Sequence, residues 1–244
     1  MKTALVTGAA RGIGLATTQQ FMTQGWQVIM VDRDANALEE AAAPLENTLS
    51  VVADVSDPDQ VAGLAARHTR IDALINNAGV ADFGPIQDTD FARWRTVMET
   101  NLDGVFLMSQ AFTPALAATR GAIVNIASIS GLRASTLRVA YGTSKAGVIA
   151  LTQQQAVELG EMGIRANAVC PGPVRTKLAM AVHTPEIIAA YHDAIPLNRY
   201  GSEDEIAAVI TFLCSAGASY VTGQTIAVDG GFEATGVGLP ALRS

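Results

Sequence analysis

Short apolar runs that favour β-structure alternate with helical stretches along almost the whole chain. Runs such as 28–31 and 123–126 are apolar throughout or nearly so, without the polar alternation of a strand that has one solvated face. Such runs are typical of strands covered on both faces, and hence of a parallel sheet. The predicted strands are Thr3–Thr7, Gln27–Val31, Leu49–Ala53, Ala73–Asn76, Ala122–Ala127, Arg165–Cys170 and Thr225–Val228.

Helical patterns fill the intervals between these strands. The pairs Asp57-Pro58 and Ser202-Glu203 are expected to begin helices, because a side-chain acceptor precedes the first turn in each. The alternation implies right-handed crossovers and an α/β fold with a doubly wound parallel sheet of about seven strands, in a single domain spanning residues 1–244. The predicted helices are Gly12–Gln24, Asn36–Ala43, Pro58–Arg67, Asp90–Ala118, Val139–Met162 and Glu203–Ser215.

One long connection interrupts the alternation. Residues 171–201 contain four prolines, at positions 171, 173, 185 and 196, and only two short helix-like segments. A connection longer than about 15 residues in a compact domain is usually functional. We therefore expect a lid or binding loop in this part of the chain.

Composition and charge exclude several classes of partner. Of the 244 residues, 49% are hydrophobic and 16% charged, and 23 acidic residues against 16 basic ones give a net charge of −7. Without a basic excess we expect neither nucleic acid nor an acidic membrane surface as partner. The start of the chain lacks the apolar stretch of a signal peptide, and no window is long enough for a membrane span, so a soluble, cytoplasmic protein is expected. The two cysteines, Cys170 and Cys214, are expected to be buried small hydrophobes.

A glycine cluster follows the first predicted strand and opens the first predicted helix. Gly8, Gly12 and Gly14 have the spacing Gly-x₃-Gly-x-Gly, with Arg11 and Ile13 between them. Glycines at such a turn permit positive φ and let the backbone approach a pyrophosphate, whose charge meets the N–H groups of the helix start. A tight strand–helix turn alone would also select glycine. The flanking strand and helix favour dinucleotide binding.

Two acidic residues at the ends of the next strands fit the adenosine half of such a ligand. Asp32 ends the second strand, where a carboxylate hydrogen-bonds the ribose hydroxyls and repels a 2′-phosphate. Arg11 would favour that phosphate, but Asp32 opposes it more directly, so the predicted cofactor is NAD. Asp54 and Val55 stand where a side chain and a backbone N–H could hold the adenine. For both aspartates, capping of the following helix is the structural alternative.

A second group of residues has side chains suited to acid–base catalysis. Tyr141 and Lys145 lie at positions i and i+4 and therefore share one face of a predicted helix. A phenol with an ordinary pKa near 10 is a poor base at neutral pH, and a neighbouring ammonium favours the phenolate. Ser128 ends the fifth strand, at the carboxyl edge where doubly wound sheets bind ligands, and its hydroxyl can donate to a carbonyl oxygen while Tyr141 transfers the proton.

These pieces together resemble the short-chain dehydrogenase/reductase family, whose fold is Rossmann-like. The match covers essentially the whole chain: Thr7-Gly8-x₃-Gly12-x-Gly14, Asn76-Asn77-Ala78-Gly79, Asn101, Ser128, Tyr141-x₃-Lys145 and Pro171-Gly172-x₃-Thr176. The resemblance implies that Tyr141 is the catalytic acid/base, that Ser128 polarises the substrate oxygen, and that Lys145 binds the nicotinamide ribose and depresses the tyrosine pKa.

The resemblance also implies roles for residues outside that catalytic set. Asn101 is similar to the holder of a water in a proton relay. Asn77, Ala78 and Gly79 resemble the segment beside the adenosine ribose. Pro171, Gly172, Val174 and Thr176 resemble the segment along the nicotinamide, with residues 173–199 as the substrate loop. Self-association through long helices is expected from the low charge content, and the family's usual assembly is a homotetramer.

Two alternative functions stay open. One is an NADPH-dependent 3-oxoacyl-thioester reductase, and the other is a nucleotide-sensing scaffold without catalysis, which has no need for the intact set Asn101, Ser128, Tyr141 and Lys145. No metal site is expected, because the three histidines show no ligand spacing. Ser128 lacks the sequence context of an acyl-enzyme nucleophile.

The substrate pocket is expected to be lined by residues 81–84, 129–133 and the loop 173–199. These segments mix small or apolar side chains with polar ones, which favours a small polar alcohol such as a sugar, polyol or hydroxy acid. Arg133 lies five residues beyond Ser128 and Arg138 three residues before Tyr141, so either could reach a substrate anion. Solvated or subunit-contact charges are the alternative for both.

Overall fold

A seven-stranded parallel sheet forms the centre of the protein. The computed structural model describes residues 1–176, 180 and 183–236. The strands follow the order β3-β2-β1-β4-β5-β6-β7, and every neighbouring pair is parallel. This confirms the predicted fold class and strand number. The strands are β1 (Thr3–Thr7), β2 (Gln27–Asp32), β3 (Thr48–Val52), β4 (Ala73–Asn76), β5 (Ala122–Ile126), β6 (Arg165–Pro171) and β7 (Thr225–Val228).

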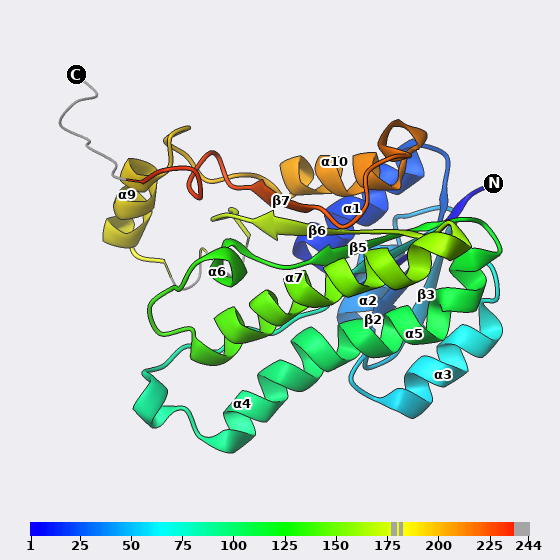
Figure 1. Cartoon of the computed structure of the whole chain (residues 1–244), viewed down its shortest axis with the longest axis horizontal. Helices are drawn as coiled ribbons and strands as arrows, with labels where there is room; N and C mark the ends of the chain where they lie inside the picture. The colour runs from blue at the N-terminus through cyan, green and yellow to red at the C-terminus, as the bar shows by residue number, and fades with distance from the viewer. Residues whose placement is uncertain (177–179, 181–182, 237–244) are drawn as a thin grey trace.

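Helices cover both faces of this sheet (Figure 1). One face carries α1, α2 and α10, and the other carries α3, α5 and α7, as the two main hydrophobic clusters show. The helices are α1 (Gly12–Thr23), α2 (Ala35–Ala42), α3 (Pro58–Arg67), α4 (Phe91–Met98), α5 (Gly104–Ala117), α6 (Ile129–Leu132), α7 (Val139–Leu159), α9 (Pro185–Ala194) and α10 (Glu203–Cys214).

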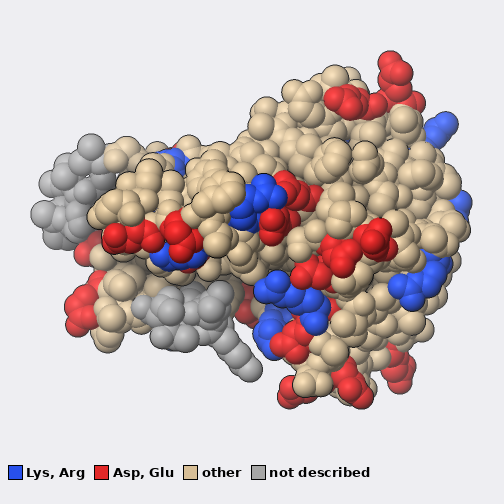
Figure 2. All heavy atoms as spheres, turned by 90° about the horizontal axis from the view of Figure 1, so that it is seen from below, with Lys and Arg blue, Asp and Glu red and all other residues tan. Residues whose placement is uncertain are grey.

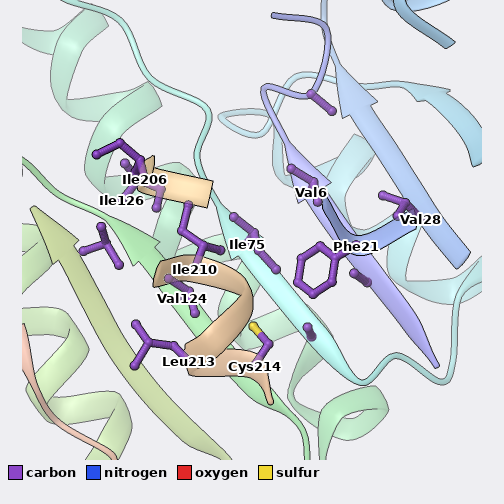
Figure 3. Packing of buried hydrophobic residues seen from close by; sticks show 14 of the residues in the cluster. Val6, Phe21, Val28, Ile75, Val124, Ile126, Ile206, Ile210, Leu213 and Cys214 are labelled. Carbon is purple, nitrogen blue, oxygen red and sulfur yellow. The ribbon is translucent and has the colours of Figure 1, made fainter. Parts of the chain in front are cut away.

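The strand sequences explain the two-sided core. Successive residues of a strand point to opposite faces, so an unbroken apolar run supplies both layers of helices. In β1, Val6 packs in the cluster with α1 and α10, whereas Leu5 packs in the cluster with α3 and α5. Figure 3 shows the first of these clusters, where Phe21 of α1 and Ile210 of α10 lie over the sheet.

Two predicted helix starts are confirmed by their caps. The Asp57 carboxylate accepts the N–H groups of Asp59 and Gln60 at the start of α3, with Pro58 in the first turn. Ser202 forms a reciprocal capping box with Glu205 at the start of α10. Because these acceptors satisfy backbone donors that a helix start leaves unpaired, both helices begin where the sequence indicates.

The long helix predicted over residues 90–118 is interrupted. It divides into α4 and α5, joined by a π-helical turn at Glu99–Asp103 that contains Asn101. At the join Gly104 lies against the side chain of Val55, where a Cβ would come within 2.8 Å of a methyl group. Such π turns accommodate an extra residue in a helix and are frequent at functional sites. The short helix α6 directly after Ser128 was not predicted.

The expected loop lies beyond the carboxyl ends of β6 and β7, where α9 stands at the edge of the molecule (Figure 1). A parallel bridge between Val174 and Gly201 closes its base. Residues 177–179 and 181–182 of the loop, and residues 237–244 of the C-terminal tail, lie outside the described residues.

No helix in the described part of the chain is long and apolar enough to cross a membrane. On the face seen in Figure 2, basic and acidic side chains lie among each other and leave broad areas without charge. No extended basic surface is visible on this face.

Candidate active site

The glycine-rich turn connects β1 to α1 at the carboxyl edge of the sheet. Gly8 and Gly12 have φ angles of +62° and +58°, a conformation that favours glycine. A Cβ on Gly14 would overlap the carbonyl oxygen of Gly8 and lie 2.6 Å from Nδ2 of Asn77. The N-terminus of α1 has no side-chain cap. The first N–H groups of the helix, those of Gly12, Ile13 and Gly14, are thus available to an anionic ligand.

Asp32 ends β2 beside this turn and is partly exposed. Its carboxylate accepts the backbone N–H of Ala10 at 3.1 Å and that of Asp34 at 3.1 Å. An ionised carboxylate offers about four acceptor positions, so two backbone bonds leave capacity for ribose hydroxyls. Asp32 therefore shapes the glycine turn and remains open to a ligand, whereas the helix-capping role belongs to Asp34.

The other charges at this end of the sheet form pairs. The guanidinium of Arg11 bonds the carboxylate of Asp34, and that of Arg33 lies 3.6 Å from the carboxylate of Asp54. Asp54 also accepts the N–H and hydroxyl of Ser56 at 2.9 and 2.7 Å. Burial raises the pKa of Asp54, but the bonds to Ser56 and the charge of Arg33 outweigh it, and the pKa is lowered. Val55 is buried against Gly104.

The segment after β4 is tied to the end of β1. Thr7 Oγ1 accepts the N–H groups of Asn77 and Ala78 at 2.9 and 3.0 Å, and the Asn77 amide donates to the carbonyl oxygens of Thr7 and Gly8. The strand order reverses between β1 and β4, and doubly wound sheets bind ligands at such a switch point. The predicted Asn77, Ala78 and Gly79 therefore lie at the edge of the glycine turn.

Ser128, Tyr141 and Lys145 converge at the end of β5. Ser128 caps α6, and its hydroxyl oxygen accepts the N–H of Ser130 at 3.1 Å, so the Ser128 hydroxyl can still donate toward Tyr141 or a bound ligand. Tyr141 and Lys145 lie one turn apart on α7, with Nζ of Lys145 5.8 Å from the centroid of the Tyr141 ring. The Lys145 ammonium donates to the carbonyl oxygen of Ile126 at 2.6 Å.

Burial governs the protonation of both side chains on α7. It raises the pKa of Tyr141, while a hydrogen bond from Ser128 and the charge of Arg138 act in the opposite direction. Burial also lowers the pKa of Lys145 to about 8. In the protein alone, Tyr141 is therefore a protonated phenol that Ser128 and Arg138 bias toward ionisation.

Asn101 joins the π turn to α7. Its side-chain carbonyl accepts the N–H of Val80 at 2.8 Å, and its amide donates to the carbonyl of Val80 and to the hydroxyl of Ser144. A Cβ at Gly79 would lie 3.2 Å from Oδ1 of Asn101 and 3.5 Å from Nζ of Lys145. The side chain of Asn101 thus ties the π turn to Val80 and to Ser144 of α7.

The segment after β6 lies on the other side of Ser128. Pro171 and Val174 are buried, and Gly172 packs against Asp229, where a Cβ would come within 2.6 Å of Asp229 Cα. Thr176 donates its backbone N–H to the carbonyl of Val174 at 2.8 Å. Cys170 is buried beside Ser128 and Lys145, and burial raises the pKa of its thiol to about 11.

Sequence patterns gave no indication of how the mouth of the site is built. The backbone N–H of Gly84 donates to the carbonyl of Leu137 at 3.0 Å, so the loop after β4 is joined to the start of α7. Arg93 holds this loop through Asp82 at 2.8 Å and the carbonyl of Phe83 at 3.0 Å. Asp82, an expected polar wall residue, is thereby already paired.

On the opposite side, the described residues of segment 183–200 pack through aromatic side chains. His183 bonds the hydroxyl of Tyr200 at 2.9 Å and stacks on Tyr191 at 5.6 Å. Tyr191 also contacts Phe232, which lies under the guanidinium of Arg133. Arg133 is bonded to the carboxylate and carbonyl of Glu233, so its charge is satisfied within the chain. Among the described residues, no group of His, Cys, Asp or Glu could hold a metal ion.

Comparison with known proteins decides the family. The family profile described as enoyl-(acyl carrier protein) reductase matches residues 8–233. The chain belongs to the short-chain dehydrogenase/reductase family. It is 41% identical over 238 residues to galactitol 2-dehydrogenase (L-tagatose-forming) of Cereibacter sphaeroides, with 94% of each chain covered.

Two further short-chain dehydrogenases/reductases mark the breadth of this similarity. The 3-oxoacyl-[acyl-carrier-protein] reductase of Thermotoga maritima is 38% identical, over 94% of this chain and 97% of that protein. The crystal structure of levodione reductase superposes with a TM-score of 0.92 at 33% identity, covering 96% of this chain and 98% of that chain. The family, the fold and oxidoreductase chemistry with a nicotinamide cofactor are thus shared across different substrates.

Proposed function

We propose that the protein is an NAD(H)-dependent dehydrogenase that interconverts a small polar secondary alcohol and its ketone. The observation that carries this proposal is the convergence of Ser128, Tyr141 and Lys145 beside the glycine turn and Asp32, on one edge of the sheet. A catalytically silent nucleotide sensor has no need for the three polar side chains at the end of β5.

The residues of the cleft fit a dinucleotide. The uncapped start of α1 offers N–H groups to the pyrophosphate, and Asp32 retains acceptor capacity for the adenosine ribose. Asp54, Val55 and the segment Asn77–Gly79 would line the adenosine half. Lys145 would bind the nicotinamide ribose, and residues 171–176 would follow the nicotinamide. When bound, the cofactor supplies or accepts the hydride.

The proton is handled by side chains of this chain. Ser128 donates a hydrogen bond to the substrate oxygen and keeps its proton, while its own oxygen accepts the N–H of Ser130. Tyr141 gives a proton to that oxygen during reduction and takes it during oxidation. The ammonium of Lys145 and the guanidinium of Arg138 favour the phenolate that oxidation requires. Asn101 fixes the π turn against α7 and thereby the position of Lys145.

Charge supports NAD over NADP. Three carboxylates, Asp32, Asp34 and Asp54, stand at the adenosine end. Asp34 is paired with Arg11 and Asp54 with Arg33. The guanidinium of Arg11, which could otherwise attract a 2′-phosphate, is thus already occupied. Within the described residues the Asp32 carboxylate accepts hydrogen bonds from backbone N–H groups and forms no ion pair, so its charge opposes a second anion.

The pocket wall supports a small polar substrate. A long acyl chain would require an unbroken apolar surface. The segments of the wall instead contribute paired charges and aromatic rings. The similarity to a galactitol dehydrogenase fits this substrate class, whereas the similarity to a 3-oxoacyl reductase supports the alternative of thioester reduction.

One experiment separates these functions. The purified protein is titrated with NAD⁺ and NADP⁺, and reduced nicotinamide is followed by absorbance with polyols, sugars, hydroxy acids, aliphatic secondary alcohols and, in reverse, a 3-oxoacyl thioester. We expect tighter NAD⁺ binding and a higher kcat/KM for a polar alcohol. Tighter NADP⁺ binding would exclude the NAD assignment, and a thioester better by tenfold would exclude the substrate class. Cofactor binding without any turnover would favour the sensor.

The protein is also proposed to form a homotetramer through the face built by α4, α5 and α7. An open groove of about 580 Å³ on this face is lined by Phe106, Leu107 and Leu151 together with the ion-paired Arg95 and Glu99. Phe106 is 47% exposed. Apolar side chains left exposed beside a groove support burial against a second copy.

A further inference from the structure

Arg138 holds a fixed place at the mouth of the proposed active site. It precedes α7, three residues before Tyr141, and its guanidinium carbon lies 4.7 Å from the ring centroid of Phe83 and 5.6 Å from that of Tyr141. The bridge between Gly84 and Arg138 fixes its backbone to the loop that carries Phe83. Two aromatic faces and a bridged backbone restrict the side chain before any ligand arrives.

The charge of Arg138 is not neutralised by a carboxylate among the described residues. The two other arginines near the mouth are paired, Arg93 with Asp82 at 2.8 Å and Arg133 with Glu233 at 2.6 Å. Aromatic faces hold a guanidinium without cancelling its charge or consuming all its N–H donors. Arg138 is therefore an available cation in a chain whose net charge is −7.

The reacting centre lies next to this cation. Tyr141, which faces the substrate oxygen in the proposed function, is itself one of the two rings against the guanidinium. An anion bonded to Arg138 and an oxygen bonded to Tyr141 thus belong to neighbouring parts of one small molecule. Burial lowers the pKa of His183, and the charge of Arg138 lowers it further, so His183 also lies within electrostatic reach of this cation.

We propose that Arg138 forms an anion-binding subsite that selects alcohols and ketones carrying a carboxylate. The inference rests on the proposed function and narrows its substrate class to hydroxy and oxo acids. A guanidinium matches a carboxylate with two parallel N–H···O bonds, and the planar fork is already oriented by Phe83 and Tyr141. A neutral polyol of the same size leaves this cation unpaired, and that difference generates specificity.

Matched substrates test the subsite. The 2-, 3- and 4-hydroxy acids of a short linear chain, each with its primary amide, are compared by kcat/KM with the preferred cofactor. The wild type should favour the acid at least tenfold for one chain length, and Arg138→Gln should reduce that ratio at least tenfold. Arg138→Lys, which keeps the charge but not the fork, should retain an intermediate ratio. Arg133→Gln is the matched control, and its ratio should stay within twofold of the wild type.

The ratio of kcat/KM for the acid to kcat/KM for the amide distinguishes a binding role of Arg138 from an effect that Arg138 exerts only through Tyr141. If Arg138 merely biased the ionisation of Tyr141, Arg138→Gln would lower kcat/KM for acid and amide alike and shift the pH profile. An unchanged acid-to-amide ratio overturns the subsite while leaving the dehydrogenase function in place.

A binding measurement covers the case in which none of these alcohols is turned over. Calorimetric titration of the corresponding oxo acids and oxo amides into the protein with reduced cofactor reports the same preference. At least tenfold tighter binding of one acid, lost in Arg138→Gln, supports the subsite even if the proposed function fails. Equal binding of acid and amide in the wild type overturns it.

Discussion

The ammonium of Lys145 donates a 2.6 Å hydrogen bond to the main-chain carbonyl of Ile126. This bond joins α7, which carries the proposed acid/base Tyr141, to the end of β5, two residues before Ser128. Lys145 is only 4% exposed and forms no salt bridge with the described residues. Desolvation therefore disfavours its charged form and lowers its pKa from 10.5 to about 8. The buried position proposed for Lys145 in catalysis therefore makes its charged form unfavourable in the folded protein.

Replacement of Lys145 by Met should therefore stabilise the protein near neutral pH. The folded-state pKa of about 8 lies below the unfolded value of 10.5, so the unfolded chain binds more protons between these values and stability rises with pH there. Below pH 8 the buried charge lowers the free energy of unfolding by up to about 3 kcal/mol. We expect Lys145→Met to exceed the wild type in urea unfolding at pH 7, with the difference closing toward pH 10.5.

An exposed lysine provides the control for that experiment. Lys2→Met removes the same charge from the surface near the start of β1. It should not reproduce the stabilisation at pH 7. If Lys145→Met is less stable than the wild type at pH 7, the bond to Ile126 outweighs the desolvation of the ammonium.

Tyr141→Phe should abolish turnover with little effect on cofactor binding. The phenyl ring still packs against Arg138, and only the transferable proton is lost. General acid–base catalysis contributes about 10²–10⁴-fold, so kcat should fall at least 100-fold while the Kd of the cofactor changes by a few-fold. A kcat within tenfold of the wild type, about 1.4 kcal/mol of barrier, would show that Tyr141 is not the acid/base.

Replacement of Asp32 should change the choice between dinucleotides. Asp32→Ala removes a charged acceptor, and NAD⁺ binding should weaken by about 1.5–3 kcal/mol while NADP⁺ binding improves. Because the Asp32 carboxylate also holds the N–H of Ala10, Asp32→Asn is needed as the isosteric control. It keeps an acceptor for the turn but removes the repulsion of a 2′-phosphate. Unchanged affinities for both cofactors in both variants would make Asp32 purely structural.

The fold could be predicted from the sequence because the strand and helix patterns are local and all indicate the same alternation. Apolar runs such as 28–31 mark doubly covered strands, and the Asp57 and Ser202 caps mark helix starts. The break at Glu99–Asp103 could not be predicted in this way. Helical periodicity continues through the π turn, and the packing of Gly104 on Val55 at the join is a tertiary contact that the local sequence does not indicate.

The candidate site was predictable where residues follow a strand or share a helix face. Ser128, Tyr141 and Lys145 are placed by the ends of β5 and α7, which the sequence indicates. Contacts between distant segments carry no such signal. The pairing of Arg133 with Glu233, 100 residues away, separates it from Arg138 as a candidate anion ligand, although the sequence offered both equally.

Gly14 is closely packed and Gly63 is not, so replacing each by alanine tests the packing of the glycine turn. Gly14→Ala introduces a Cβ that overlaps the Gly8 carbonyl, so we expect a loss of several kcal/mol or failure to fold, together with loss of cofactor binding. Gly63 lies exposed within α3, with nothing within 4 Å of an added Cβ. Gly63→Ala should stabilise the protein by about 0.5–1 kcal/mol. Urea unfolding checks both, and a Gly14→Ala variant as stable as the wild type would contradict the packing argument.

The proposed homotetramer is tested at the groove of the α4, α5 and α7 face. Light scattering at micromolar concentration should give four times the chain mass, and Phe106→Asp should reduce it, because a carboxylate would be desolvated against the second copy. Ile187→Asp, on the exposed helix α9 and outside this groove, should leave the mass unchanged. Circular dichroism ensures that each variant is folded. A wild-type mass of one chain would contradict self-association, whereas a tetramer untouched by Phe106→Asp would place the interface on another face.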